Sequence, residues 1–162
     1  MTCFCPDCFA EYPLGARTCP RCGASLDATG RDYLEKLIRA LQHPAPSVPI
    51  QAALVLGGRG DPRAVEPLSE ALCTNPEMGF QEAAVEALGR LRDPRAVPAL
   101  IEALRHSYLS VRTRAAWALG EIGTDEARQA LEEALNDPSL SVRQAAARAL
   151  ATEPPGKFQR NP

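Results

Sequence analysis

Apolar residues recur at helical spacing through most of the chain. Between residues 111 and 122 they follow the pattern i, i+4, i+7, i+8 and i+11, at Val111, Ala115, Ala118, Leu119 and Ile122. This spacing places them on one face of an α-helix, with polar residues on the other face. We refer to a helix of this kind as helix A.

A second apolar stripe follows Asp93 and Pro94, and it consists of Val97, Leu100, Ile101 and Leu104. Asp is a preferred N-cap residue, and a proline at the first helical position lacks only an N–H that would have no partner there. We therefore expect a helix, here helix B, to begin near Asp93.

The two helical patterns repeat with a fixed period. One set of leucines is spaced 31, 32 and 31 residues apart, and a second apolar set is spaced 32, 31 and 31 apart. The sets are Leu41, Leu72, Leu104 and Leu135, and Val48, Phe80, Val111 and Val142. Such a period is typical of a solenoid, in which stacked helix pairs complete one another's core. Gly57, Gly89 and Gly120 each follow a core leucine, which predicts either a close approach of neighbouring helices or a turn late in helix A.

The predicted fold is all-α: a solenoid of about eight helices, with a first helix B near residues 31–42, three A–B pairs, and a last helix A near 142–151. We expect four segments along the chain. They are a cysteine module at 1–26, a linker at 27–30, the repeats at 31–152 and a disordered tail at 153–162.

Composition narrows the class of protein. The net charge is −2, so neither a polyanion-binding surface nor an acidic tail is indicated. No stretch approaches the roughly 18 apolar residues of a membrane span. The first residues, MTCFCPDC, do not resemble a signal peptide, and we expect a cytoplasmic protein.

Four cysteines form two pairs of metal-ligand spacing, Cys5-Pro6-Asp7-Cys8 and Cys19-Pro20-Arg21-Cys22. Each pair can turn two sulfurs towards one ion, and four thiolates complete a tetrahedron. The pattern resembles a zinc ribbon and predicts one structural Zn²⁺ on Cys5, Cys8, Cys19 and Cys22, with iron as the alternative metal. Cys3 is a fifth thiol that could take part. Gly23 follows the second pair as in the ribbon family, whereas Phe9 stands in the first glycine position.

The segments DPRAVPALIEAL and VRTRAAWALGEIG resemble HEAT-like repeats of the phycobilisome-lyase type, and the resemblance covers about residues 31–152. It implies the fold, but the family includes pigment-attachment factors, iron hydroxylases and interaction scaffolds. The hydroxylases carry His-Glu pairs, whereas Pro44 follows His43 and Ser107 follows His106 here. The sequence therefore does not favour a hydroxylase.

In HEAT-like stacks helix B lines the concave side, so the resemblance implies an acidic inner surface. A solvated face without a ligand is the alternative to a partner surface there. Trp117 is a further candidate contact, although it could instead pack against an adjacent repeat. The candidate partner-binding residues are Glu66, Glu70, Glu102, Glu132, Glu133 and Trp117. The acidic set predicts a protein partner with a basic segment.

Several other residues have structural interpretations. His43 and His106 follow helix B at equivalent positions, where they are expected to interact with the helix dipole. Arg112 and Arg143 are expected to form ion pairs between repeats, with Asp137 as a partner. Cys73, at the end of a helix B, is expected to be a partly buried apolar residue.

No catalytic set of residues is apparent, so the sequence predicts a non-enzymatic scaffold or adaptor that binds a protein through the repeat surface and the zinc ribbon. Two alternatives stay open. One is a nucleic-acid-binding module that uses the ribbon, and the other is a pigment-lyase-like helper protein.

Overall fold

The computed structural model describes residues 2–5, 8, 10–13, 16–23 and 30–152. In these residues two short strands precede eight α-helices. The strands are β1 (Thr2–Phe4) and β2 (Glu11–Pro13). The helices are α1 (Gly30–Ala40), α2 (Ser47–Arg59), α3 (Val65–Thr74), α4 (Met78–Leu91), α5 (Val97–Ala103), α6 (Leu109–Ile122), α7 (Asp125–Ala134) and α8 (Leu140–Ala151).

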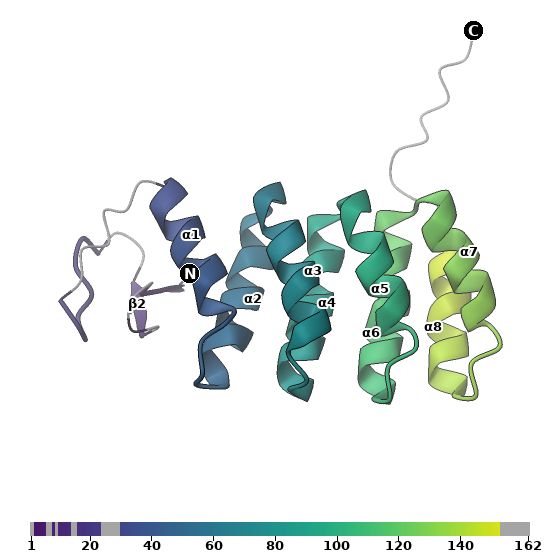
Figure 1. Cartoon of the computed structure of the whole chain (residues 1–162). Coiled ribbons are helices and arrows are strands. Elements are labelled where there is room, and N and C mark those ends of the chain that lie inside the picture. Colours follow the sequence, from purple (N-terminus) through teal and green to yellow (C-terminus); the bar gives the residue numbers. More distant parts are fainter. Residues whose placement is uncertain (1, 6–7, 9, 14–15, 24–29, 153–162) are drawn as a thin grey trace, which may run out of the picture.

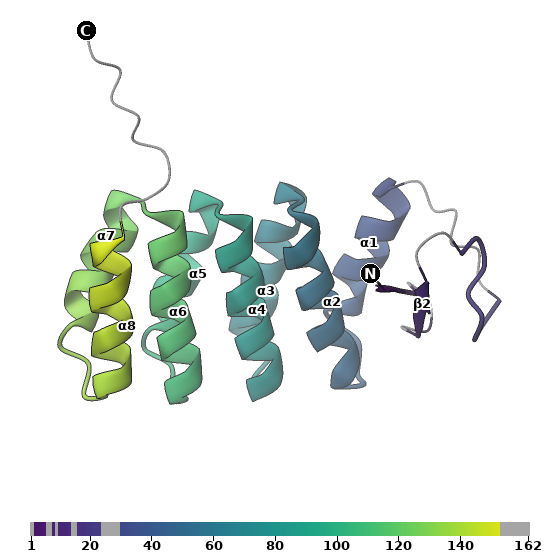
Figure 2. The same cartoon turned by 180° about the vertical axis from the view of Figure 1, so that it is seen from behind.

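The helices form two layers that run side by side along the molecule. Helices α1, α3, α5 and α7 make one layer, which faces the viewer in Figure 1. Helices α2, α4, α6 and α8 make the other, which faces the viewer in Figure 2. We call them the B layer and the A layer, because their members are the predicted B and A helices. One continuous apolar core lies between the layers.

The predicted solenoid is thus confirmed: α1 is the first helix B, three A–B pairs follow, and α8 is the last helix A. The division of the chain into four segments stays a prediction. Its tail and all of its linker except Gly30 lie outside the described residues.

Two B helices begin with an aspartate cap, as the sequence predicts for Asp93. The carboxylates of Asp61 and Asp93 accept hydrogen bonds from the N–H groups of Arg63 and Arg95, at 3.0 and 2.9 Å. Each cap opens a 3-10 turn rather than the α-helix itself, and α3 and α5 start three residues after the proline. Because a 3-10 turn is tighter than an α-helical turn, the aspartate cap and the proline both fall within one turn of backbone.

The loops from helix B to helix A share one hydrogen bond. A side chain accepts from the N–H two residues further on, at 3.1, 3.0, 3.2 and 2.7 Å in His43, Asn75, His106 and Asp137. In the two histidines the acceptor is Nδ1. The histidines thus stabilise the loops that follow helix B, and their expected interaction with the helix dipole stays a prediction.

A second position, on helix A, stabilises three of these four loops through hydrogen bonds to their carbonyl groups. Gln81 donates to the carbonyl of Asn75 at 2.6 Å, Arg112 to that of His106 at 2.9 Å and Arg143 to that of Asp137 at 2.8 Å. The predicted ion pair between repeats is present as well. Arg112 Nε lies 2.9 Å from Asp137, and both side chains are largely buried.

The A helices approach one another through glycine and alanine. A Cβ added at Gly57 would lie 2.6 Å from the Cα of Ala87, closer than real contacts allow. Gly89 stands in the same way against Ala118, with 2.9 Å to its Cβ, and Gly120 against Ala149, with 2.6 Å. These contacts join α2 to α4, α4 to α6 and α6 to α8. The glycines therefore provide the close approach that the sequence offered as one interpretation.

The two layers differ in how closely their helices pack. Neighbouring A helices contact each other along much of their length, whereas α3 and α5, and likewise α5 and α7, contact each other far less. Since a stack curves towards the side on which its members lie closer, we infer that the A layer faces inwards. This inference runs against the expectation that helix B lines the concave side, because the glycines lie in helix A.

We predict opposite effects for two neighbouring glycines of α2. Gly57→Ala should clash with Ala87, while a Cβ at Gly58 meets nothing within 4 Å. Both changes gain up to about 1 kcal/mol of helix propensity. The difference in unfolding free energy between the two variants therefore measures the overpacking cost at Gly57, about 1–3 kcal/mol. Urea unfolding followed by circular dichroism should show Gly58→Ala as the more stable. Equal stabilities would mean that Gly57 does not set the helix spacing.

We also predict a pH dependence from Asp137. Burial raises the pKa of this carboxyl, but hydrogen bonds from Arg112 and the Ser139 N–H, with the charges of Arg112 and Arg143, bring it below its ordinary value. A lowered folded pKa stabilises the protein above the unfolded pKa of about 3.9, and this stabilisation disappears as pH falls through the folded pKa.

Asp137→Asn should therefore cost about 1–3 kcal/mol near neutral pH, and the loss should shrink in acid. Unfolding curves at pH values on both sides of 4 measure this. Glu102→Gln is the control, because its pair with Arg105 is exposed and should contribute less than about 1 kcal/mol. A loss that is the same at every pH would contradict the account.

Candidate metal centre and surface groove

The cysteine module is built on a hairpin and two turns. Strands β1 and β2 pair antiparallel, with Cys3 opposite Tyr12. Beyond β1 the N–H of Cys5 donates to the carbonyl of Ala10 at 2.9 Å, and the N–H of Gly23 donates to that of Cys19 at 2.9 Å. Gly23 has a φ of 72°, a left-handed conformation that favours glycine. The glycine predicted to end the second turn is therefore required there.

The structure brings the four predicted thiols together. The sulfurs of Cys5, Cys8, Cys19 and Cys22 all lie within 4.8 Å of one another. Cys5 and Cys22 are 3.6 Å apart, and Cys8 and Cys19 are 3.5 Å apart. A tetrahedral ion with metal–sulfur bonds of about 2.3 Å needs sulfurs about 3.8 Å apart. The cluster is thus compatible with a metal site.

One thiol of the cluster is set to ionise. Burial alone would raise the pKa of Cys19, but hydrogen bonds from the N–H groups of Cys22 and Arg21, and from the thiols of Cys8 and Cys5, lower it to about 6. The Arg21 N–H lies 3.4 Å from the sulfur. Since a metal ligand must be a thiolate, this environment favours metal binding.

The described part of the module has a small apolar cluster. Its buried residues are Cys5, Tyr12 and Cys19, with Cys8, Ala10 and Ala16 packed against them. So small an apolar cluster does not stabilise a fold without a further constraint, and a bound metal supplies one.

The remaining cysteine predictions have different outcomes. Phe9 and the side chain of Cys3 lie outside the described residues, so their roles stay open. Cys73 is exposed, and the expectation that it is partly buried is wrong. It lies near the end of α3, where the neighbouring Leu72 already fills the core position.

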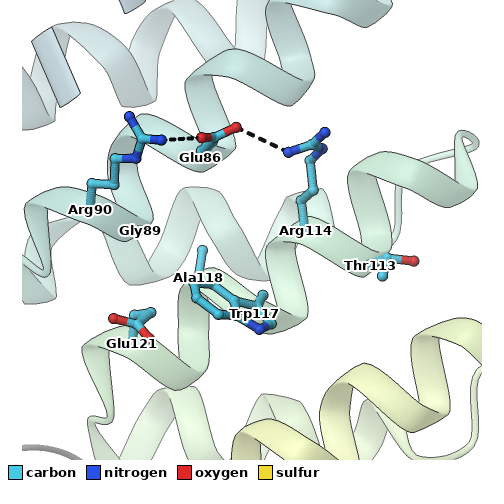
Figure 3. A pocket seen from close by; sticks show the side chains of 8 residues that line it. All are labelled: Glu86, Gly89, Arg90, Thr113, Arg114, Trp117, Ala118 and Glu121. Atoms are coloured by element: carbon cyan, nitrogen blue, oxygen red, sulfur yellow. Dashed lines mark hydrogen bonds and ion pairs between the residues drawn. The ribbon is translucent and has the colours of Figure 1, made fainter. Parts of the chain in front are cut away.

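A second candidate site is a groove on the A layer, around Trp117. Figure 3 shows its lining side chains, which come from α4 and α6. The hollow measures about 590 Å³, with Gly89, Ala118 and Trp117 as its apolar part. Trp117 is 63% exposed, the largest value among the exposed large hydrophobic residues described. This exposure does not fit the alternative that Trp117 packs against the next repeat. Gly89 and Ala118 are in close contact and leave no room for the ring between the helices.

Charged side chains border the groove in pairs. Glu86 binds Arg90 at 2.5 Å and Arg114 at 3.0 Å (Figure 3). Arg114 also lies 3.7 Å from Glu82, and Glu121 pairs with Arg92. Each carboxylate of the groove is thus neutralised by an arginine of the same surface.

The predicted acidic residues lie elsewhere, on the B layer. Glu66, Glu70, Glu102, Glu132 and Glu133 are all exposed, on α3, α5 and α7. Two of them are partly neutralised, because Glu66 pairs with Arg95 and Glu102 with Arg105, both at 3.0 Å. The structure therefore separates the candidate partner residues, with Trp117 on one layer and the glutamates on the other.

Stacked helix pairs with a core shared between repeats define an α-solenoid, here with a four-cysteine cluster at its N-terminus. The sequence matches the model of HEAT repeats over residues 34–113 and 77–151. The chain therefore belongs to the HEAT repeat family. No curated protein matches the sequence.

Several solved structures are similar. Human deoxyhypusine hydroxylase is 30% identical, with a TM-score of 0.66 over 73% of this chain and 42% of the hydroxylase. An engineered protein is 30% identical, with a TM-score of 0.59 over 73% of this chain and 62% of that protein. The chain thus spans less than two thirds of either protein.

The complex of CpcE and CpcF of phycocyanin lyase, from Nostoc sp., is 24% identical, with a TM-score of 0.52 over 85% of this chain and 69% of that one. At this identity the likeness shows the fold alone. It agrees with the predicted resemblance to lyase-type HEAT repeats.

These comparisons contradict one expectation. The sequence predicted that the chain is not an enzyme, yet similar structures include a hydroxylase and components of a lyase. Repeat scaffolds of one fold carry different functions, so a sequence without a familiar catalytic set is not thereby excluded from the enzymes. Among the described helices, none has the length and apolar character needed to cross a membrane.

We predict one metal ion per chain, held by the four-cysteine cluster. Cys19→Ser should lose the ion and unfold the hairpin, because removing one thiolate opens the coordination shell. Cys73→Ser, a change of the same kind at an exposed site, should keep it. Elemental analysis measures the metal, and circular dichroism should show the repeats still helical in both variants. Metal that stays bound in Cys19→Ser would refute the ligand set.

Proposed function

We propose that this HEAT repeat protein binds a protein partner through its A layer, with the cysteine module as a zinc-bound second unit. One observation carries the proposal: a tryptophan that is 63% exposed stands beside a hollow on the surface. A large aromatic side chain that is exposed at such a hollow has a large apolar area, which a partner removes from water on binding. Tryptophan is also enriched among the residues that dominate binding energy.

The position of the groove on the stack supports the same function. Solenoids use their inner surface as an extended binding face. The A layer has the closer helix packing and is therefore the inner side by the argument given above. A partner that follows this face would meet Trp117 near its middle, between α4 and α8.

Zinc is the metal that we propose for the cluster. It accepts four thiolates in a tetrahedron and needs no open position in a structural site. A cluster of four cysteines with metal-ligand spacing also suits a compartment that keeps thiols reduced, which supports a cytoplasmic location. Iron in the same four thiolates is the alternative, and elemental analysis distinguishes the two metals.

The acidic B layer is a second candidate surface, for a basic protein segment. Glu70, Glu132 and Glu133 are exposed and form no ion pair within the described part of the chain. Like charges at repeated positions raise the local potential and attract cations. The pairing of Glu66 and Glu102 weakens this field, so we rank the A layer first.

Nucleic acid is less well supported as a partner. A protein that binds it needs several arginines or lysines free to neutralise phosphates. On the A layer Arg90, Arg92 and Arg114 are each paired with a carboxylate. Arginines paired in this way leave too little net positive charge for a run of phosphates, and a partly apolar groove suits a protein better.

Paired variants test the two surfaces. Trp117→Ala should weaken capture of the natural partner by about thirtyfold or more, since a central tryptophan often contributes 2 kcal/mol or more. The triple change Glu70→Lys, Glu102→Lys and Glu133→Lys should leave capture unchanged. Quantitative mass spectrometry of proteins that are cross-linked to each variant measures both. If only the triple variant loses capture of the partner, the binding surface is the B layer.

A further inference from the structure

The A layer carries a second apolar feature beside the Trp117 groove. Met78, Leu109 and Leu140 are the first residues of α4, α6 and α8. They are spaced 31 residues apart in the sequence and are 47%, 45% and 58% exposed. Since equivalent repeat positions line up across a stack, the three side chains form a row that crosses the A layer. We call them the apolar row.

The row and the groove belong to one trough. Met78 and Leu109 line a second hollow of about 660 Å³, which includes Thr113 and Arg114. Thr113 and Arg114 also line the hollow at Trp117. Eight residues of α6 separate Leu109 from Trp117, which is about 12 Å along a helix and close to the diameter of an α-helix with its side chains. A helix that lies across α6 can therefore contact Leu109 and Trp117 together.

The spacing of the row selects a helical occupant. Neighbouring packed helices lie about 8–10 Å apart, so successive members of the row are separated by roughly that distance. In an α-helix, residues seven positions apart lie on one face and are about 10.5 Å apart. In a strand, residues on one face are about 6.6 or 13 Å apart. A helix that crosses the A layer can therefore place one apolar side chain on each member of the row.

The charges of the trough select the partner's polar residues. Arg90, Arg92 and Arg114 have side chains that are 54%, 53% and 46% exposed, while their partners Glu82, Glu86 and Glu121 are only 26%, 33% and 27% exposed. The carboxylates are therefore the more buried members of these pairs, and the guanidinium groups are the more exposed. Arg148, at the position of α8 equivalent to Trp117, forms no ion pair with any described carboxylate.

We propose that the trough binds an amphipathic α-helix of a partner protein, with apolar residues at a seven-residue repeat and with Asp or Glu beside them. This deepens the proposed function, on which it rests. The apolar residues contact the row and Trp117, and the acidic residues face Arg90, Arg114 and Arg148. Such recognition uses the anchor spacing of one helix face.

A display library of alanine-based helical peptides tests this, with the full chain as the selecting protein. Enriched peptides should carry apolar residues seven positions apart and acidic residues between them. Their binding, measured by fluorescence anisotropy, should weaken about tenfold or more for Leu109→Ser and stay unchanged for Leu135→Ser. Leu135 is the matched control, because it is 39% exposed and ends the B-layer helix α7.

Three results would overturn the inference: no enrichment, enrichment of basic or aperiodic peptides, or binding that Leu109→Ser does not change. Its failure is separable from that of the proposed function. If Trp117→Ala still abolishes capture of the natural partner, the A layer binds a protein that is not such a helix. If Trp117→Ala has no effect on capture, the proposed function itself is wrong.

Discussion

Close contacts between glycine and alanine set the spacing of the helices in the A layer. Three glycines, Gly57, Gly89 and Gly120, each stand against an alanine of the next A helix with no room for a Cβ. Side chains of this size let helix backbones approach closely, and the B helices lack an equivalent set. The difference in spacing between the layers gives the stack its inner and outer sides.

The same constraint shapes the surface. Where glycine and alanine fill the space between helices, a large side chain on the A layer must point outwards. Trp117 precedes Ala118, which contacts Gly89, so its ring lies on the surface above that contact. The apolar row consists likewise of the first residues of α4, α6 and α8, which are exposed and lie outside the core. The candidate partner surface is thus a consequence of how the core is packed.

Much of the fold could be predicted because its signals are local and repeated. The period of 31–32 residues, the stripes of leucine and valine and the aspartate caps fix the helices and their order. The cysteine spacing likewise predicts the four-thiol cluster. What the sequence could not show depends on contacts between repeats. The pairing of Glu66 with Arg95 joins residues 29 apart, and the loop role of His106 depends on the direction of its ring.

The side of the stack that faces inwards depends on contacts between repeats. The resemblance to HEAT-like stacks implies that helix B is the inner layer, whereas the close approach of the glycines in each helix A points to the A layer. With the A layer inside, Trp117 lies on the inner surface, apart from the acidic residues of helix B.

The exposure of Trp117 tests this account most directly, because the chain has a single tryptophan and its fluorescence reports on one position. In the free protein we predict the red-shifted emission of tryptophan in water and efficient quenching by acrylamide. Blue-shifted emission that resists quenching would contradict the account, since it would place the ring inside the core, where the contact of Gly89 with Ala118 leaves no space.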